Sequence, residues 1–520
     1  MILPYALLFS VLTVFASLAS LLTFSRLWQI KEWRFDRLRE HLRENGWYRQ
    51  LLGTVRPLLT GILLFLSGLK IFWGTDGIIV CLLTLAALSL VQMVRSKHRP
   101  VWTAKAKAIV ALSAIIIFLV SCGVVIVGDM HPEWNALLVA TLLLLPLFTP
   151  AFAILSWTML RPVDHALKNK VLRKAMELRS SHPNLRVIGI TGSVGKTTVK
   201  EMMSHILKDL GALTTPERVN TEMGVAAWLT NILSAEPADS TRIVIVEMGA
   251  YKKGEIALLC RIAKPQFGII TYVGNQHLSL FGSPEAIIEA KGELFAALPS
   301  EGKAFGNSDN AAYEVLKKRC ICPVVAVGTG QHADVLATDI EETGSGIRFQ
   351  TLGTVFNVPV AGTHNVTGAL LAIAVAQELG MKPAEIAAKL QSFKRMSRTF
   401  ELKKCGDVTV LDDTYNSSPA SVRAAIVWAA KQPQHKKILV LEGIIELGDA
   451  EGRIHTELAT LAAPVFTEAY AAHPRHLTYL RDGGFGPRAR MASERHEKAE
   501  NGSLIVFAGR LSSSVMSRFT

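Results

Sequence analysis

Five apolar runs in the first third of this chain constrain its fold more than any other feature. They lie at about 4–24, 57–73, 77–94, 108–128 and 136–157. A helix needs about 20 apolar residues to cross the hydrocarbon core of a bilayer. The first, fourth and fifth runs reach that length, whereas the second and third are short and lie close together. We expect an α-helical region of about five transmembrane helices over 1–160, with the short runs forming a hairpin or a pair that does not fully span.

The basic residues predict how this region is oriented. Segments 25–56 and 95–107 carry eight and five Lys or Arg residues, whereas 74–76 and 129–135 carry none. Loops rich in Lys and Arg stay on the cytoplasmic side. We therefore expect a multi-pass protein of the cytoplasmic (inner) membrane, with its N-terminus outside and its large C-terminal part in the cytoplasm. A signal peptide is the alternative for the first run, but that run lacks a basic start and a small-residue cleavage site.

Composition disfavours several classes of function. The formal net charge is +13, but much of the excess flanks apolar runs and no basic patch is interleaved with aromatic residues, so we expect no nucleic-acid partner. The six cysteines form no CxxC pair and accompany no His cluster, which indicates neither a zinc site nor a disulfide framework. Residues 31–49 mix charged and aromatic side chains, as in an interfacial amphipathic helix or a solvated one.

The remaining two-thirds of the chain predicts an α/β fold. From residue 185, short apolar β-rich runs alternate with helical stretches. Such alternation is typical of a parallel sheet covered by helices. One helical segment ends near 396, and a new strand begins after it. We expect a linker helix over 161–184, a central domain over 185–396 and a smaller, Rossmann-like C-terminal domain over 397–520.

The strongest motif is RVIGITGSVGKTTVKEM at 186–202. A β-run ends in a Gly-containing loop, and a helix is expected to start at Lys196. In such a loop, backbone N–H groups and the helix N-terminus bind phosphate, the Lys reaches the terminal phosphates and the hydroxyl ligates Mg²⁺. The strict GxxxxGK[ST] spacing is not met, because Ile190 stands where Gly is required. The predicted nucleotide contacts are Gly192, Ser193, Val194, Gly195, Lys196, Thr197 and Thr198.

The TGSVGKTT form resembles the phosphate loop of the Mur ligase family, and further segments match that family in order. They are NTEMG (220–224), RIVIVEMGAYKKGEI (242–256), TYVGNQHLSLFGSPEAIIEAKGELF (271–295), GTHNVTGALLA (362–372), SRTFE (397–401), LDDTYNSSPASVRAAI (411–426) and VLEGIIELG (440–448). Their order and spacing over about 185–515 make the resemblance specific. It implies a P-loop central domain of the Mur-ligase type.

The resemblance also implies a magnesium-dependent site. Lys196 would bind the phosphates, and Thr197 and Glu247 would bind the first Mg²⁺. His277 and Lys291 would serve the second, with Lys291 carbamylated as in relatives. A carbamate would supply an anionic oxygen of the kind Mg²⁺ prefers. The remaining roles would fall to Asn365 at adenine, Arg398 at the phosphates, Asp413 at ribose, and Asn220, Asn416 and Ser418 at the substrates.

The activity that the resemblance implies is ATP-dependent, ADP-forming ligation of a carboxylate and an amine through an acyl phosphate. The DDTYN and IELG segments look most like the family member that adds D-alanyl-D-alanine to a UDP-muramoyl tripeptide in peptidoglycan synthesis. The expected cofactors are ATP and Mg²⁺. The expected partners are a muramoyl-peptide substrate, an amino acid or dipeptide, and the membrane.

Three departures keep the substrates open. Membrane spans stand where the family has a UDP-sugar-binding domain, so the acceptor is either UDP-linked or lipid-linked. Ser418 replaces the family's second Asn, and Ala508-Gly509-Arg510-Leu511 replaces its KGSR; both changes affect the amine side. The alternatives are a membrane-bound ligase for another polymer, such as poly-γ-glutamate, and a nucleotide-binding protein without ligase activity.

Overall fold

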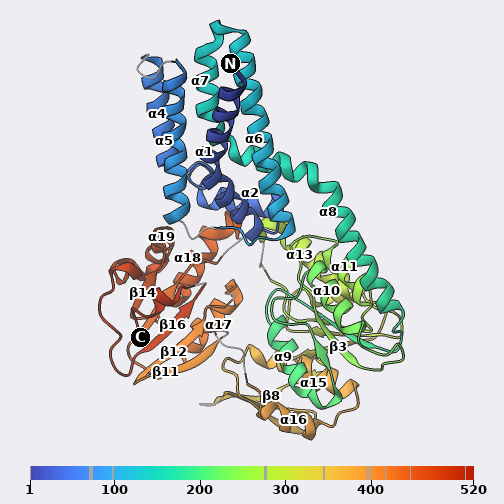
Figure 1. Ribbon diagram of the computed structural model, residues 1–520. Helices are drawn as coiled ribbons and strands as arrows, with labels where there is room; N and C mark the ends of the chain where they lie inside the picture. The colour runs from blue at the N-terminus through green and yellow to red at the C-terminus, as the bar shows by residue number, and fades with distance from the viewer. Residues whose placement is uncertain are drawn as a thin grey trace. The chain divides into compact units, whose positions relative to one another are not determined.

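The chain divides into two compact units, Met1–Asn169 and Lys170–Thr520. The computed structural model describes residues 2–69, 74–95, 99–274, 278–343, 346–394, 398, 400–415, 417–444, 447–509 and 511–520. In the described part, the first unit contains only helices, whereas the second combines helices with strands (Figure 1). This mixture confirms the predicted fold class.

The described part of the first unit consists of helices, most of them apolar and α2 strongly charged. They are α1 (Ile2–Ile30), α2 (Phe35–Asn45), α3 (Trp47–Leu51), α4 (Val55–Gly68), α5 (Gly74–Arg95), α6 (Ala104–Met130), α7 (Asn135–Leu144) and the first part of α8 (Thr149–Ser180). Among the described residues, four helical segments are long and apolar enough to cross a membrane: Leu3–Ile30, Gly74–Arg95, Ala104–Met130 and Asn135–Ser180.

The second run, which we expect either to form a hairpin with the third or not to span fully, contains helix α4. Helix α4 has 14 residues, or about 21 Å at 1.5 Å per residue, which is short of the roughly 30 Å hydrocarbon core. The third run lies within the 22-residue α5 and is long enough. The fifth run covers α7, a short 3-10 turn at Leu145–Phe148 and the start of α8. Helix α8 then continues without a break into the predicted linker helix and ends at Ser180.

The predicted helix over 31–49 is instead two short helices. Helix α2 ends at Asn45, and Gly46 adopts a φ of +78° before α3 begins at Trp47. Just before α2, Trp28 packs against Trp33, Phe35 and Trp157 with ring centroids 5.0–5.7 Å apart. Large aromatic rings beside charged side chains are typical of membrane–water boundaries, so the interfacial placement stays a prediction with physical support.

The second unit contains a seven-stranded parallel sheet with the order β2-β3-β1-β4-β5-β6-β7. Its strands are β1 (Arg186–Thr191), β2 (Leu213–Thr214), β3 (Ile243–Glu247), β4 (Phe267–Ile270), β5 (Lys303–Asn307), β6 (Val324–Gly328) and β7 (Val335–Leu336). Strand β1 pairs with β3 on one side and β4 on the other. Ligands of open α/β sheets bind at such a switch in strand order, outside the carboxyl ends of the strands.

Helices bury both faces of this sheet. They are α9 (Lys196–Ile206), α10 (Glu222–Leu233), α11 (Glu255–Ala263), α12 (Leu278–Phe281), α13 (Pro284–Ala296), α14 (Tyr313–Lys317), α15 (Asn365–Glu378) and α16 (Pro383–Gln391). Because strand side chains alternate between faces, Ile188 and Ile190 join the core under α9 and α15, whereas Val187 joins the core under α10, α11 and α13. Burial on both faces explains the continuous apolar strands.

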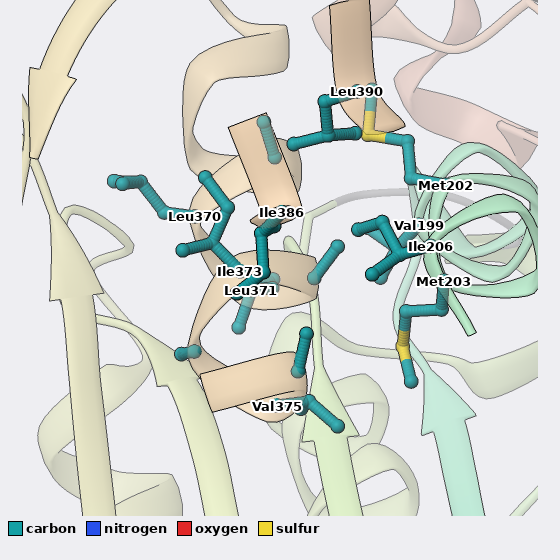
Figure 2. Packing of buried hydrophobic residues seen from close by; sticks show 14 of the residues in the cluster. Val199, Met202, Met203, Ile206, Leu370, Leu371, Ile373, Val375, Ile386 and Leu390 are labelled. Carbon is teal, nitrogen blue, oxygen red and sulfur yellow. The ribbon is translucent and has the colours of Figure 1, made fainter. Parts of the chain in front are cut away.

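The phosphate-loop helix α9 is fixed by its packing on α15 and α16. Figure 2 shows Val199, Met202, Met203 and Ile206 of α9 among side chains of the other two helices. These partners include Leu370, Leu371, Ile373, Val375, Ile386 and Leu390. Their burial holds the N-terminus of α9 at the carboxyl end of β1.

Two further sheets complete the unit. A three-stranded antiparallel sheet is formed by β8 (Thr338–Thr343), β9 (Gly346–Thr351) and β10 (Thr354–Val358). A six-stranded sheet has the order β11-β12-β16-β13-β14-β15, with β11 (Glu401–Cys405), β12 (Val408–Asp413), β13 (Lys437–Leu441), β14 (Glu468–Ala471), β15 (Ala489–Met491) and β16 (Leu504–Ala508). Its helices are α17 (Pro419–Ala430), α18 (Glu451–Ala462), α19 (Pro474–Leu480) and α20 (Ser513–Met516). The predicted domain boundaries stay predictions.

The packing of α9 predicts a stability difference between two residues of the same segment. Ile206 is fully buried, whereas Leu210 is 49% exposed. We expect Ile206→Ala to lower the free energy of unfolding by about 2–5 kcal/mol, because it removes buried methyl groups and leaves a cavity. Leu210→Ala should change it by less than about 0.5 kcal/mol. Urea unfolding of the full chain in detergent checks this, and equal losses would contradict the packing.

Candidate nucleotide and metal site

The phosphate loop follows β1 and is closed by close backbone contacts. Gly192 has a φ of +148°, and a Cβ there would lie 2.0 Å from Thr271 Oγ1. Gly195, at φ +86°, precedes the first turn of α9. The Ser193 N–H donates to the Tyr272 carbonyl at 2.6 Å, and the Thr271 hydroxyl donates to the Val194 carbonyl at 2.6 Å. Glycine is therefore required at 192, where both the left-handed backbone and the close approach exclude a side chain.

Lys196 turns its amine into this loop. Its Nζ donates to the Gly192 carbonyl at 2.6 Å and lies 3.4 Å from the Ser193 carbonyl oxygen. Burial lowers the pKa of Lys196, and the carboxylate of Glu247 opposes that shift. The predicted residues Thr197 and Thr198 follow in the first turn of α9, whose N-terminus favours anions. The amine, the loop and the helix start thus converge at one place.

Glu247 ends β3, and two other predicted site residues contact its carboxylate. Thr197 Oγ1 donates to its Oε2 at 3.2 Å, and Asn220 Nδ2 donates to its Oε1 at 3.1 Å. A hydroxyl and a carboxylate this close offer the hard oxygen ligands that Mg²⁺ prefers. The donor set therefore fits a magnesium ion held by Thr197 and Glu247. Among the described residues no cluster of three or more His, Cys, Asp or Glu forms a metal site by itself.

Lys291 lies in α13 and is only 3% exposed. Burial is the main cause that lowers its pKa to about 7, and the charge of Lys196 lowers it further. The carboxylates of Glu255 and Glu293 act in the opposite direction. Near neutral pH a large fraction of Lys291 is therefore an uncharged, nucleophilic amine. The electrostatic influence of Lys196 on Lys291 indicates that the two predicted residues belong to the same site.

Two predicted residues, His277 and Asn416, lie outside the described residues. Of the other substrate-side predictions, Asn220 contacts Glu247, as above. Ser418 is 2% exposed and begins α17, where its hydroxyl accepts the Ser421 N–H at 3.1 Å. The Ser418 N–H in turn donates to the Ser421 hydroxyl at 2.9 Å. This capping box occupies the Ser418 side chain with the helix start, and its predicted substrate contact stays a prediction.

The remaining nucleotide predictions fall at element ends. Asn365 begins α15, and its Nδ2 donates to the Ala361 carbonyl at 2.7 Å. Arg398 donates through Nε to Thr414 Oγ1 at 2.8 Å and through Nη2 to the Leu511 carbonyl at 3.0 Å. Asp413 ends β12 and accepts the Phe400 N–H at 3.1 Å. Arg398 and Asp413 thus contact residues beside the six-stranded sheet. Glu247 and its partners Thr197 and Asn220, which we call the Glu247 network, lie at the seven-stranded sheet.

Sequence reasoning missed Lys200 and Thr215, which also belong to the Glu247 network. Lys200 Nζ lies 3.4 Å from Glu247 Oε2. Thr215 Oγ1 accepts the Glu247 N–H at 3.1 Å. A signal for Lys200 was available, because residues three and four apart share a helix face and Lys200 follows Thr197 by three. No comparable signal marks Thr215.

Comparisons with known proteins agree with this geometry. The profile of the "Mur ligase middle domain" matches residues 190–376. A UDP-N-acetylmuramoyl-tripeptide–D-alanyl-D-alanine ligase from Bacillus subtilis is 33% identical over 338 residues, or 62% of this chain and 72% of the relative. Its namesake from Mycobacterium bovis is 36% identical over 54% of this chain, which spans only 56% of that relative. The solved MurF ligase from Thermotoga maritima in complex with ADP has a TM-score of 0.56 and 25% identity, covering 67% of this chain and 82% of that one.

The loop geometry predicts that Gly192→Ala weakens nucleotide binding. The added Cβ would displace Thr271, whose hydroxyl holds the loop, and would strain the backbone by about 1–3 kcal/mol. We expect at least about tenfold weaker binding of a fluorescent ATP analogue, which corresponds to about 1.4 kcal/mol. Gly368→Ala in α15 is the matched control, since its Cβ would meet only Val199 Cγ2 at an ordinary 3.5 Å. Unchanged binding by Gly192→Ala would refute the close approach.

The lowered pKa of Lys291 predicts that the free energy of unfolding depends on pH. Its pKa is about 7 in the folded chain against an ordinary 10.5, so between these values unfolding takes up a proton. The penalty of burying the ammonium is fully present below pH 7 and absent above pH 10.5, so stability rises with pH across that window. In carbonate-free buffer, Lys291→Met should flatten this rise in the free energy of unfolding. The exposed Lys318→Met should leave the slope unchanged; equal slopes for all three proteins would contradict the shift.

Proposed function

Because this chain belongs to the Mur ligase family, we propose that it is an ATP-dependent, ADP-forming ligase that joins a carboxylate to an amine in peptidoglycan precursor synthesis. The observation that carries the proposal is the network of Lys196, Thr197, Glu247 and Asn220 at the carboxyl edge of the parallel sheet. At that edge lie the phosphate-binding loop, the hydroxyl of Thr197 and the carboxylate of Glu247 as oxygen ligands that suit magnesium, and the amide of Asn220 beside them. The ADP complex of the Thermotoga relative supports ATP as the nucleotide.

The chain's part in the reaction is positioning and charge neutralisation. The γ-phosphoryl group passes from ATP to the acceptor carboxylate, the amine attacks the acyl phosphate, and phosphate leaves. The loop N–H groups and Lys196 neutralise phosphoryl oxygens that gain charge in transfer. Thr197 and Glu247 would hold Mg²⁺, which when bound draws charge from the transferring phosphoryl group. Holding carboxylate and nucleotide together makes the first step effectively unimolecular.

For Lys291 we propose a second, anionic form. A neutral amine adds to carbon dioxide, the new N–C bond forms, and loss of one proton leaves a carbamate with two oxygens. Burial supports this step because it favours the uncharged amine near neutral pH. The product would replace the neutral amine with an anion whose charge is opposite to that of Lys196, and would provide oxygen ligands for a second magnesium ion together with the predicted His277.

For the acceptor we propose a muramoyl peptide, with D-alanyl-D-alanine or a similar amine as the incoming group. The name of the Bacillus relative supports both. The four helices able to span a membrane support placement of the chain in the cytoplasmic membrane. This tether keeps the catalytic unit at the surface where lipid-linked precursors are concentrated, so both the UDP-linked and the lipid-linked acceptor are candidates that one assay distinguishes.

The assay is phosphate release from ATP by the purified full chain in detergent. Either the UDP-muramoyl tripeptide or its lipid-linked counterpart is supplied, each with and without D-alanyl-D-alanine. We expect release only when one acceptor and the dipeptide are both present. Release that ignores both substrates would contradict ligase chemistry, and release with glutamate instead of the dipeptide would favour a ligase for another polymer.

The same assay tests the role of Lys196. We expect Lys196→Ala to lower kcat at least about a hundredfold, the scale found when a group that stabilises transition-state charge is removed. Lys208→Ala, on the exposed stretch after α9, should retain parental activity. A folded Lys196→Ala protein that still ligates would rule out the phosphate role.

A further inference from the structure

Lys200 is an ammonium group taken entirely out of water. Its side chain is 0% exposed. Its Nζ donates to the Thr215 carbonyl at 3.0 Å, and it lies 3.4 Å from Glu247 Oε2 and 3.5 Å from Glu201 Oε1. A buried charge is retained only when it is paired and hydrogen-bonded. These three oxygens therefore account for the position of the Lys200 amine.

Those contacts join three elements at the edge where the site lies. Lys200 belongs to α9, Thr215 directly follows β2, and Glu247 ends β3. Thr215 also holds Glu247 from the other side, because its hydroxyl accepts the Glu247 N–H at 3.1 Å. Lys200 and Thr215 thus fix both the side chain and the backbone of Glu247.

The Glu247 carboxylate is surrounded by donors with different functions. Thr197 Oγ1 contacts Oε2 at 3.2 Å and Asn220 Nδ2 contacts Oε1 at 3.1 Å, and both residues are candidates for the metal or the substrate. Lys200 has neither role, since its other contacts are the Thr215 carbonyl and Glu201. Its contact with Glu247 therefore indicates an effect of the Lys200 amine on the Glu247 carboxylate itself.

We infer that Lys200 is a positioning residue that orients the Glu247 carboxylate for Mg²⁺, an inference that rests on the proposed function because that function assigns the metal to Glu247. Partners that hydrogen-bond a ligating carboxylate fix its orientation and tune the metal, and their loss costs about 10–100-fold in metal affinity or activity. Without Lys200 the carboxylate would keep, among the residues that the structure describes, the contacts with Thr197 and Asn220, both of which are also candidates for the metal or the substrate.

The test measures metal binding rather than turnover. Mn²⁺ binding in the presence of ADP is followed by electron paramagnetic resonance for the full chain in detergent, its Lys200→Met and Lys200→Gln variants, and the exposed control Lys208→Met. We expect Mn²⁺ to bind about 10–100-fold more weakly to both Lys200 variants, and as tightly to Lys208→Met as to the parent. Thermal unfolding establishes that each variant is folded.

A double-mutant cycle separates positioning from a general structural effect. In a Glu247→Gln background the carboxylate is already gone, so adding Lys200→Met should weaken Mn²⁺ binding no further. Additive losses, or Mn²⁺ affinity within twofold of the parent in a folded Lys200 variant, would overturn the inference. Failure of both Lys200 variants to fold would also overturn it, by making Lys200 a residue of stability alone. A parent chain that binds no Mn²⁺ with ADP would instead refute the proposed function.

Discussion

Burial of strand β1 in the middle of the parallel sheet is the constraint from which the catalytic unit is built. Its backbone pairs with β3 and β4, and its side chains enter the apolar cores on both faces. The chain must therefore leave the sheet at the carboxyl edge in one tight loop, and α9 must pack back over the sheet. That turn places the loop N–H groups, Lys196 and Thr197 beside the end of β3, where Glu247 is found. The apolar packing of the sheet and its helices thus places these polar groups together at the carboxyl edge.

Much of this unit could be predicted from the sequence. Continuous apolar strands, a glycine loop and a helix starting at Lys196 are local patterns, and the structure confirms all three. The spacing of Lys200 three residues after Thr197 could place it on the same helix face, but its burial and its contacts could not be predicted, because they depend on oxygens of Thr215 and Glu247 from other elements. The cap of α17 is different, because Ser418, Pro419 and Ser421 form a local helix-start pattern, so the sequence alone could have indicated it.

The helical first unit shows which structural details length and hydropathy do not predict. The apolar runs located α1, α4, α5 and α6, but they did not indicate the charged helix α2 or the continuation of α8 to Ser180. In a bilayer each polar group must also be satisfied internally, and α1 does this through hydroxyls of Ser10, Thr13 and Ser17 that donate to carbonyls one turn earlier. Hydroxyls bonded in this way can lie within an apolar helix, although a hydropathy average records only that the helix is apolar.

The central claim is that an acyl phosphate links ATP to amide formation, and isotope transfer tests it most directly. The acceptor peptide is prepared with both oxygens of its reacting carboxylate labelled with ¹⁸O, and the products are analysed by mass spectrometry. The account predicts one ¹⁸O in the released phosphate and one in the new amide, because phosphoryl transfer leaves one carboxylate oxygen on phosphorus. Phosphate without ¹⁸O, released while amide forms, would contradict it.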